Sequence, residues 1–268
     1  MKRCGWGLVI VSIAVLTLSG LAPNALAQQG VPSSKATAQI NTVVYCNVSN
    51  AASADLGTAP MTCKDVFSGN PMQPGPDNFV DIMTTTMKVS NSQSLFVSPS
   101  LVTGLYTNTL VKTKTGGSST ATAQGGVYLR AVLKDPAVGN VVQVADPVAV
   151  CNNDILGCQP IGNDYGVVLD SRVQTLNQSL SDCVVNAGLL TGTCSFDSTI
   201  QLILRTTSAH TFNFIFPNVG VGVYYVVIQA AVNSNATVGG SGTAVGGAAF
   251  GLGSVTVESV RLVHNFAF

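Results

Sequence analysis

Charged side chains are scarce in this chain. Only 9% of its 268 residues are Asp, Glu, Lys or Arg, whereas an ordinary soluble domain has roughly 25%. The 12 basic and 12 acidic residues cancel, so the chain lacks the basic excess typical of nucleic-acid binding, and we expect no nucleic-acid partner. A surface of uncharged polar residues also lacks the charge repulsion that keeps proteins apart. Self-association or a surface polymer fits such a surface, although the sequence identifies no partner.

Catalytic signatures are missing as well. The sequence contains no G-x-S-x-G, H-E-x-x-H or G-x-x-x-x-G-K-[ST] motif. It has only two histidines, His210 and His264, and each falls in a predicted strand. We therefore expect no catalytic residue and no cofactor. A secreted hydrolase without a recognisable motif stays an alternative, because Ser, His and Asp can meet in space from distant parts of a chain.

Metal ligands and stacking aromatics are equally sparse. No pair of cysteines has the C-x2-C spacing of a zinc site. Loop carboxylates such as Asp81, Asp154 and Asp164 belong to no D-x-[DN]-x-[DN]-G calcium loop, so we interpret them as turn formers and expect no metal. The single tryptophan, Trp6, lies in the predicted leader, which leaves only Tyr and Phe for stacking on a sugar.

The N-terminus has the pattern of a secretory signal peptide. A basic start, an apolar run over 7–21 and the A-x-A site at 25–27 predict cleavage after residue 27. We therefore expect export, to the extracellular space, the cell surface or the periplasm. The most apolar later stretch, 219–232, is shorter than the roughly 18–20 residues of a membrane helix, so we expect no transmembrane helix in the mature chain.

The cysteines predict a disulfide framework. Of seven cysteines, Cys4 falls in the predicted leader, and the even remainder in an exported chain indicates disulfides, for which sequence alone permits 15 pairings. The cysteines form three pairs of sequence neighbours, and local loops are the simplest arrangement. The predicted pairs are Cys46–Cys63, Cys151–Cys158 and Cys183–Cys194.

The shortest of these loops, "CNNDILGC", is a weak candidate for ligand binding. A tight disulfide-closed tip is a good place to display a recognition surface, and its polar residues are Asn152, Asn153 and Asp154. Turn formation is the favoured interpretation of these residues, because Asn and Asp are common in turns.

Alternating apolar residues predict an all-β fold, mainly antiparallel. In 126–134, the apolar side chains of every second residue share one face, and 210–217 alternates likewise. In 167–174, Val167, Leu169 and Val173 lie opposite Asp170, Arg172 and Gln174. Half-buried strands of this kind predict a two-sheet β-sandwich, jelly-roll or immunoglobulin-like.

Three regions depart from this regular pattern. Asp197 is a plausible helix N-cap before an apolar stretch, so we predict a short helix near 198–206, although the same residues alternate in part and a strand is the alternative. Residues 28–80 read as an N-terminal strand and an irregular disulfide-closed segment, followed by the main sandwich domain over 81–268. The glycine-rich tract 238–253 separates the last two strong strands.

The C-terminal run "SVTVESVRLVHNFAF" raises a second fold. A terminal Phe268 after alternating residues is compatible with a small outer-membrane β-barrel. The alternation is broken, however, because Val255 and Val257 share one face and Val260 and Leu262 the other. This change of phase predicts a β-bulge near Glu258-Ser259 and favours the closing strand of a sandwich.

Two stretches carry a resemblance. "FPNVGVGVYYVVIQAAV" with the terminal "GSVTVESVRLV" resembles the last two strands of immunoglobulin-like and jelly-roll sandwiches. Together with "SLFVSPSLVTGLYTNTLVKTK", it is similar to uncharacterised exported prokaryotic β-sandwich proteins. The resemblance covers about a third of the chain and implies a fold but no activity. We therefore expect a secreted, disulfide-stabilised, non-catalytic β-sandwich with a structural, adhesive or binding role.

Overall fold

The computed structural model describes residues 36–57, 60–67, 72–74, 78–151, 157–187 and 190–260, with backbone alone for 72–74, 183–187 and 190–194. Strands make up 76% of the described residues, which contain almost no helix. The elements are β1 (Ala36–Asn41), β2 (Val44–Ala52), α1 (Cys63–Val66), β3 (Met72–Pro74), β4 (Val80–Val89), β5 (Gln93–Lys114), β6 (Ser118–Lys134), β7 (Val141–Val144), the 3-10 helix η1 (Val148–Val150), β8 (Cys158–Ile161), β9 (Asp164–Ser179), β10 (Cys183–Ala187), β11 (Leu190–Cys194), β12 (Asp197–Thr211), β13 (Phe214–Val219), β14 (Gly222–Gly239) and β15 (Ser241–Val260).

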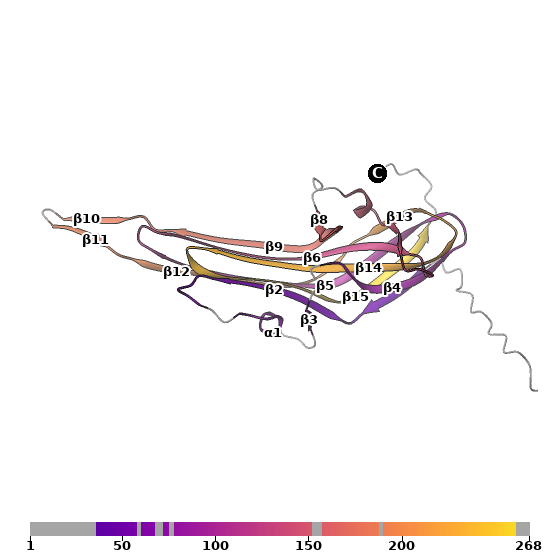
Figure 1. The fold of residues 1–268 in the computed structure, drawn as a ribbon, viewed down its shortest axis with the longest axis horizontal. Coiled ribbons are helices and arrows are strands. Elements are labelled where there is room, and N and C mark those ends of the chain that lie inside the picture. The colour runs from indigo at the N-terminus through magenta and orange to yellow at the C-terminus, as the bar shows by residue number, and fades with distance from the viewer. Residues whose placement is uncertain are drawn as a thin grey trace, which may run out of the picture. The chain divides into compact units, whose positions relative to one another are not determined.

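These strands form two packed sheets, so the predicted two-sheet β-sandwich is confirmed (Figure 1). The first sheet has the order β12-β5-β15-β2-β3, with β13 also pairing with β5 and β1 with β15. The second has the order β4-β14-β6-β9-β8, with β7 also pairing with β6. Every pairing is antiparallel except that of β2 with β3, and β10 and β11 form a separate hairpin.

Consecutive strands often belong to opposite sheets. The connections β4–β5, β5–β6, β13–β14 and β14–β15 all cross from one layer to the other. The last of these consists of Gly240 alone, whose φ of 78° is a left-handed conformation that suits glycine. The two layers are therefore joined repeatedly by tight connections of the backbone.

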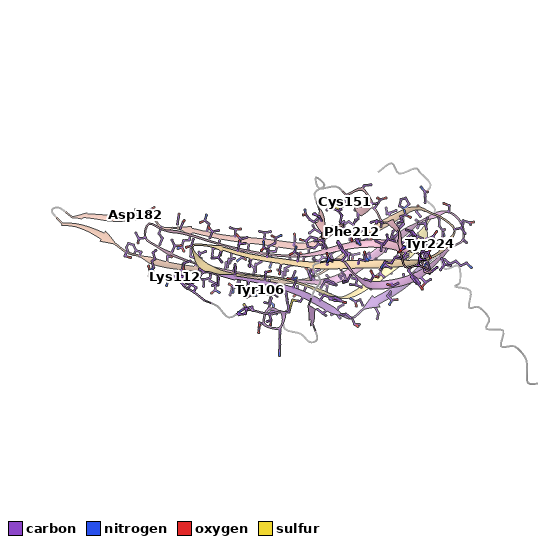
Figure 2. All side chains as sticks on the ribbon, in the orientation of Figure 1. Tyr106, Lys112, Cys151, Asp182, Phe212 and Tyr224 are labelled. Carbon is purple, nitrogen blue, oxygen red and sulfur yellow. A yellow bond between two sulfur atoms is a disulfide. The ribbon has the colours of Figure 1, made fainter. Side chains whose placement is uncertain are left out.

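The main core lies between the sheets and is rich in large side chains. Phe214, Phe216 and Phe250 are fully buried there, and Phe212 and Tyr224 pack against the same cluster at one end of the sandwich (Figure 2). Toward Lys112, near the other end in Figure 2, the buried cluster is built instead from Val111 and small alanines. The large aromatic core side chains therefore lie toward one end of the sandwich.

Glycines allow the backbones of the two sheets to approach closely. A Cβ atom on Gly246 of β15 would lie 2.2 Å from the carbonyl oxygen of Gln124 in β6. A Cβ atom on Gly125 would lie 2.5 Å from the carbonyl oxygen of Gly247. Because real Cβ atoms never lie so close to backbone, only glycine fits at these two positions.

The predicted helix near 198–206 is wrong. Residues Asp197–Thr211 form strand β12, which pairs with β5 without interruption from Asp197 opposite Lys114 to Thr211 opposite Ser100. The partial alternation of apolar residues, which favoured a strand, is the correct signal here. Pairing with β5 supplies a hydrogen-bonding partner along the whole segment. A single N-cap residue offers far less stabilisation.

The predicted bulge is also misplaced. Glu258 and Ser259 pair in continuous register with Phe96 and Leu95, and the register shift lies between Gly251 and Ser254. Leu252 there has a φ of 46°, and its side chain is exposed. The change of phase predicted between Val257 and Val260 is therefore absent, and the strand shifts its register upstream instead, within the glycine-rich tract.

The strand predicted over 167–174 has its faces exchanged. The register of β9 against β6 shifts at Val168–Asp170, so that after this bulge the polar residues face the opposite sheet. Val173 consequently lies on the outer face and is 63% exposed, while Gln174 is buried. The bulge reverses the side of the strand that alternation alone assigned to the core.

Candidate functional site

Polar side chains line the interior at the open side of the sandwich, where β9 of the second sheet lies opposite β5 and β12 of the first. We call this row the inter-sheet seam. It consists of Asp170, Arg172 and Gln174 from β9, Thr103, Thr107 and Thr109 from β5, and Thr206, Ser208 and His210 from β12. It is the place where the structure brings together groups that could do chemistry.

Gln174 occupies the middle of the seam. Its Oε1 atom accepts a hydrogen bond from the Thr107 hydroxyl at 2.7 Å. Its Nε2 atom donates to the Thr109 hydroxyl at 2.5 Å and to the carbonyl oxygen of Leu202 at 2.8 Å. Because both threonines are fully buried, this amide is the polar partner that makes their burial tolerable. Arg172, beside it on β9, donates to the Thr206 hydroxyl.

His210, one of the two histidines of the sequence, lies in the seam beside a serine and an aspartate. The Ser208 hydroxyl is 2.7 Å from His210 Nε2, and Asp170 Oδ2 is 3.4 Å from the same nitrogen. In a catalytic triad the aspartate holds one ring nitrogen and the serine the other. Here both contact Nε2, so Asp170 is not placed to orient the ring for proton abstraction from Ser208.

Asp170 is instead bound by hydroxyl groups of the opposite sheet. The Thr103 hydroxyl donates to Asp170 Oδ2 at 2.6 Å, and the Ser208 hydroxyl approaches the same oxygen at 3.5 Å. Asp170 belongs to the second sheet, whereas Thr103 and Ser208 belong to neighbouring strands of the first. The cluster therefore acts as a polar cross-link between the two layers.

A second polar network covers the outer face of the second sheet. Arg130 donates to Gln229 at 2.6 Å and forms an ion pair with Asp164 at 2.6 Å. Asp81 accepts from Gln229 Nε2 at 2.5 Å and from Lys134 Nζ at 2.6 Å. Two of the carboxylates interpreted from sequence as turn formers, Asp81 and Asp164, therefore lie in strands and are paired with cations.

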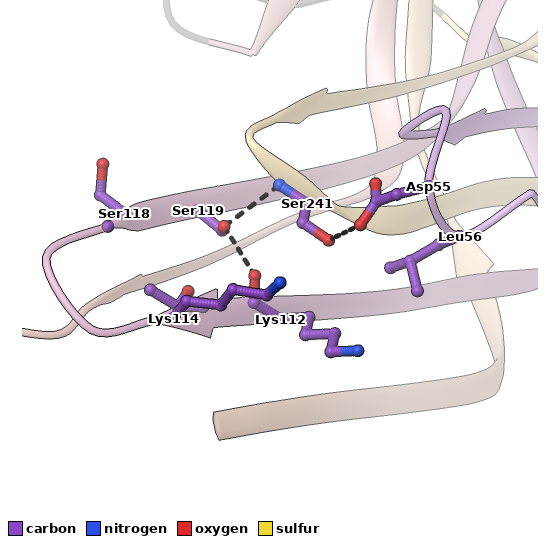
Figure 3. A pocket seen from close by; sticks show the side chains of 9 residues that line it. Asp55, Leu56, Lys112, Lys114, Ser118, Ser119 and Ser241 are labelled. Atoms are coloured by element: carbon purple, nitrogen blue, oxygen red, sulfur yellow. Dashed lines mark hydrogen bonds between the residues drawn. The ribbon is translucent and has the colours of Figure 1, made fainter. Parts of the chain in front are cut away.

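A small hollow of about 360 Å³ lies at the β14–β15 connection (Figure 3). The Ser241 hydroxyl donates to Asp55 at 2.5 Å, and Ser119 accepts from the Ser241 backbone N–H at 3.1 Å. The hydrogen bond from Ser241, together with one from Ser53, lowers the pKa of the Asp55 carboxyl. Lys112 and Lys114 also line the hollow (Figure 3). The hydroxyl groups here hold the connection, and among the described residues no histidine lines the hollow to activate them.

The structure holds two of the predicted disulfides, Cys46–Cys63 and Cys151–Cys158. Cys183 and Cys194 stand directly opposite each other in the β10–β11 pair. The weak binding candidates Asn152, Asn153 and Asp154 lie outside the described residues, as do His264 and the predicted leader. Sequence reasoning missed the seam, because the β9 bulge that turns Asp170 and Gln174 inward leaves no clear signal.

Within the described ranges, no three His, Cys, Asp or Glu side chains come together as a metal site. In that same part of the chain, no helix is long and apolar enough to cross a membrane. Comparison with family models, with curated proteins and with solved structures finds no match for this chain.

Proposed function

We propose that this chain is an exported, disulfide-stabilised, non-catalytic β-sandwich with a structural or adhesive role at the cell surface or in the extracellular space. The observation that carries the proposal is the inter-sheet seam. Its Asp170 side chain accepts hydrogen bonds from Thr103 and Ser208 of the opposite sheet. His210 is hydrogen-bonded to Ser208 of its own strand, so the groups that chemistry would need are engaged with one another.

Strand length supports the same role. β5 has 22 residues, β15 has 20 and β14 has 18, whereas strands of globular proteins usually have 3–10. At about 3.3 Å per residue, β5 alone extends roughly 70 Å. Two long sheets cross-linked by a polar seam make a rigid body suited to spanning a distance or presenting an end. Two disulfides are compatible with an oxidising compartment.

The proposal is tested by expressing the full chain with its own leader in a bacterial host. We expect the product outside the cytoplasm, starting at Gln28, with no cysteine available to a thiol-alkylating reagent after denaturation. Cells that carry it should adhere to surfaces or to one another more than cells that carry an empty vector. Retention in the cytoplasm with reduced thiols would overturn the proposal.

The same preparation tests the hydrolase alternative. Wild type and His210→Ala are assayed side by side on ester, peptide and glycoside substrates. We expect no turnover by either protein. A hydrolytic activity that disappears in His210→Ala while the fold is retained would establish an enzyme and contradict the proposed role.

A further inference from the structure

The outer edge of the first sheet is unusually open to pairing. β12 lies at the end of the strand order, and among the described strands none pairs with its other side. Natural edge strands are normally short, or protected by lysine, proline or a bulge. β12 runs for 15 residues, contains neither Lys nor Pro, and pairs with β5 without a register shift. We call its free side, residues 197–211, the β12 edge.

The backbone of the β12 edge presents its odd-numbered residues outward. The Phe196 carbonyl accepts a hydrogen bond from Thr115, and the Phe212 N–H donates to the Pro99 carbonyl. Because hydrogen-bonding direction alternates along a strand, even-numbered residues point their backbone groups at β5. The N–H and C=O groups of residues 197, 199, 201, 203 and 205 therefore point away from the sheet.

The side chains along this edge are apolar and solvent-exposed. Ile200, Leu202, Ile203 and Leu204 are 43%, 42%, 53% and 41% exposed, respectively. The even-numbered members share the face of Thr206 and Ser208, which contact β9. They thus belong to the inner face of the sandwich, but the opposite sheet leaves them partly uncovered.

We propose that the β12 edge pairs antiparallel with the β12 edge of a second copy of this chain, centred on Gln201. This register places Asp197 opposite Arg205 of the second copy, and Arg205 opposite its Asp197, so the two-fold axis produces the charge pair twice. It also places Ile200 opposite Leu202 on the apolar face. Gln201 meets its own counterpart at an outward-pointing position, as hydrogen-bonded pairing requires.

The extent of this pairing is sufficient for a specific dimer. Between residues 197 and 205 it forms about ten backbone hydrogen bonds. β11 continues the line of β12 (Figure 1). In the same register, the remainder of β12 of one copy therefore runs beside β11 of the second copy. The combined contact of about 20 residues is roughly 70 Å long and about 10 Å deep. That is roughly 700 Å² per partner, close to the ~800 Å² of a standard interface.

The inference deepens the proposed structural role, and it has its own test. Sedimentation velocity of the purified, oxidised chain over roughly 1–300 μM should show a dimer. Asp197→Lys should raise the dissociation constant about tenfold, since it places like charges opposite each other at two sites. Asp197→Lys with Arg205→Asp should restore dimerisation. Glu258→Lys, an equal change of charge at an exposed position of β15, is the control and should dimerise as the wild type does.

A covalent test fixes the register. Cysteine at position 201 of each copy would stand in a hydrogen-bonded pair with Cα atoms about 5.5 Å apart, within the range for a disulfide. Gln201→Cys should therefore form a covalent dimer under mild oxidation, and Thr207→Cys should not. The pairing is overturned if the wild type is monomeric at every concentration. It is also overturned if Asp197→Lys leaves the dissociation constant unchanged and both cysteine variants cross-link equally. An exported and adhesive but monomeric chain would overturn it without affecting the proposed function.

Discussion

Replacing Gln174 with leucine tests whether the inter-sheet seam holds the two layers together. Leucine has a similar volume, so the change removes the amide and leaves little cavity. Three hydrogen bonds are lost, and the buried hydroxyls of Thr107 and Thr109 lose the partner that lies between them. A net hydrogen bond contributes about 1 kcal/mol, and each buried group left unpaired costs about 1–3 kcal/mol. We expect Gln174→Leu to lower the free energy of unfolding by about 3–5 kcal/mol.

A compensating variant gives a more specific test of the hydrogen bonds in the seam. Changing Thr107 and Thr109 to valine in the Gln174→Leu background removes the unpaired hydroxyls, and replacing all partners by apolar groups of similar shape is nearly neutral. Urea unfolding should therefore place the triple variant within about 2 kcal/mol of the wild type. Gln39→Leu, at an exposed position of β1, is the control and should change stability by less than about 0.5 kcal/mol. A Gln174→Leu protein as stable as this control, or a triple variant with no recovery, would refute a structural seam.

Three further predictions concern other positions. Gly246→Ala should lower the free energy of unfolding by about 3 kcal/mol, because its Cβ would meet backbone oxygens of Gln124 and Asn235. The control is Gly239→Ala, since nothing lies within 4 Å of a Cβ atom there. Equal unfolding midpoints of the two variants would contradict the close approach of the sheets. Burial raises the pKa of the Asp146 carboxyl above its ordinary 3.8, and its Oδ1 atom has no hydrogen-bond partner among the described residues. The folded state therefore binds this proton more tightly than the unfolded state. Relative to Asp146→Asn, the wild type should therefore lose stability as the pH rises from about 4 through the folded pKa. Urea titrations of both proteins at a series of pH values measure this difference, and parallel pH dependences would argue against it. Peptide mapping of the oxidised chain should recover Cys183 linked to Cys194, which stand opposite each other in β10–β11, and a different partner for either would disprove the pairing.

The two-sheet fold follows from alternation where one face of a strand is uniformly apolar. Val127, Leu129, Ala131 and Leu133, which alternate in the sequence, are all buried in the main core. The outcome is different where a bulge intervenes. The bulge at Val168–Asp170 in β9 and the one at Gly251–Ser254 in β15 each exchange the faces of the residues that follow, and neither has a local signature strong enough to locate it.

The seam and β12 escaped prediction for a related reason. Asp197 and the apolar residues after it favour a helix when judged over a short window, but the 15 residues of β5 that pair with them lie far away in sequence. Likewise, Asp170 and Gln174 would be assigned to solvent by polarity alone. Their burial depends on hydroxyl groups supplied by another sheet, and sequence patterns contain no information on such distant partners.

The crossing of consecutive strands between layers has a consequence for how the chain folds. Because β5 and β6 enter opposite sheets, these two consecutive strands cannot pair with each other. Lys114 of β5 must find Asp197, and Lys134 of β6 must find Tyr225. Loop closure over such separations makes folding slow. We propose that this chain is exported, and slow folding would keep it unfolded while it crosses the membrane. The complete sandwich forms only after β14 and β15 have emerged, because these strands complete both sheets.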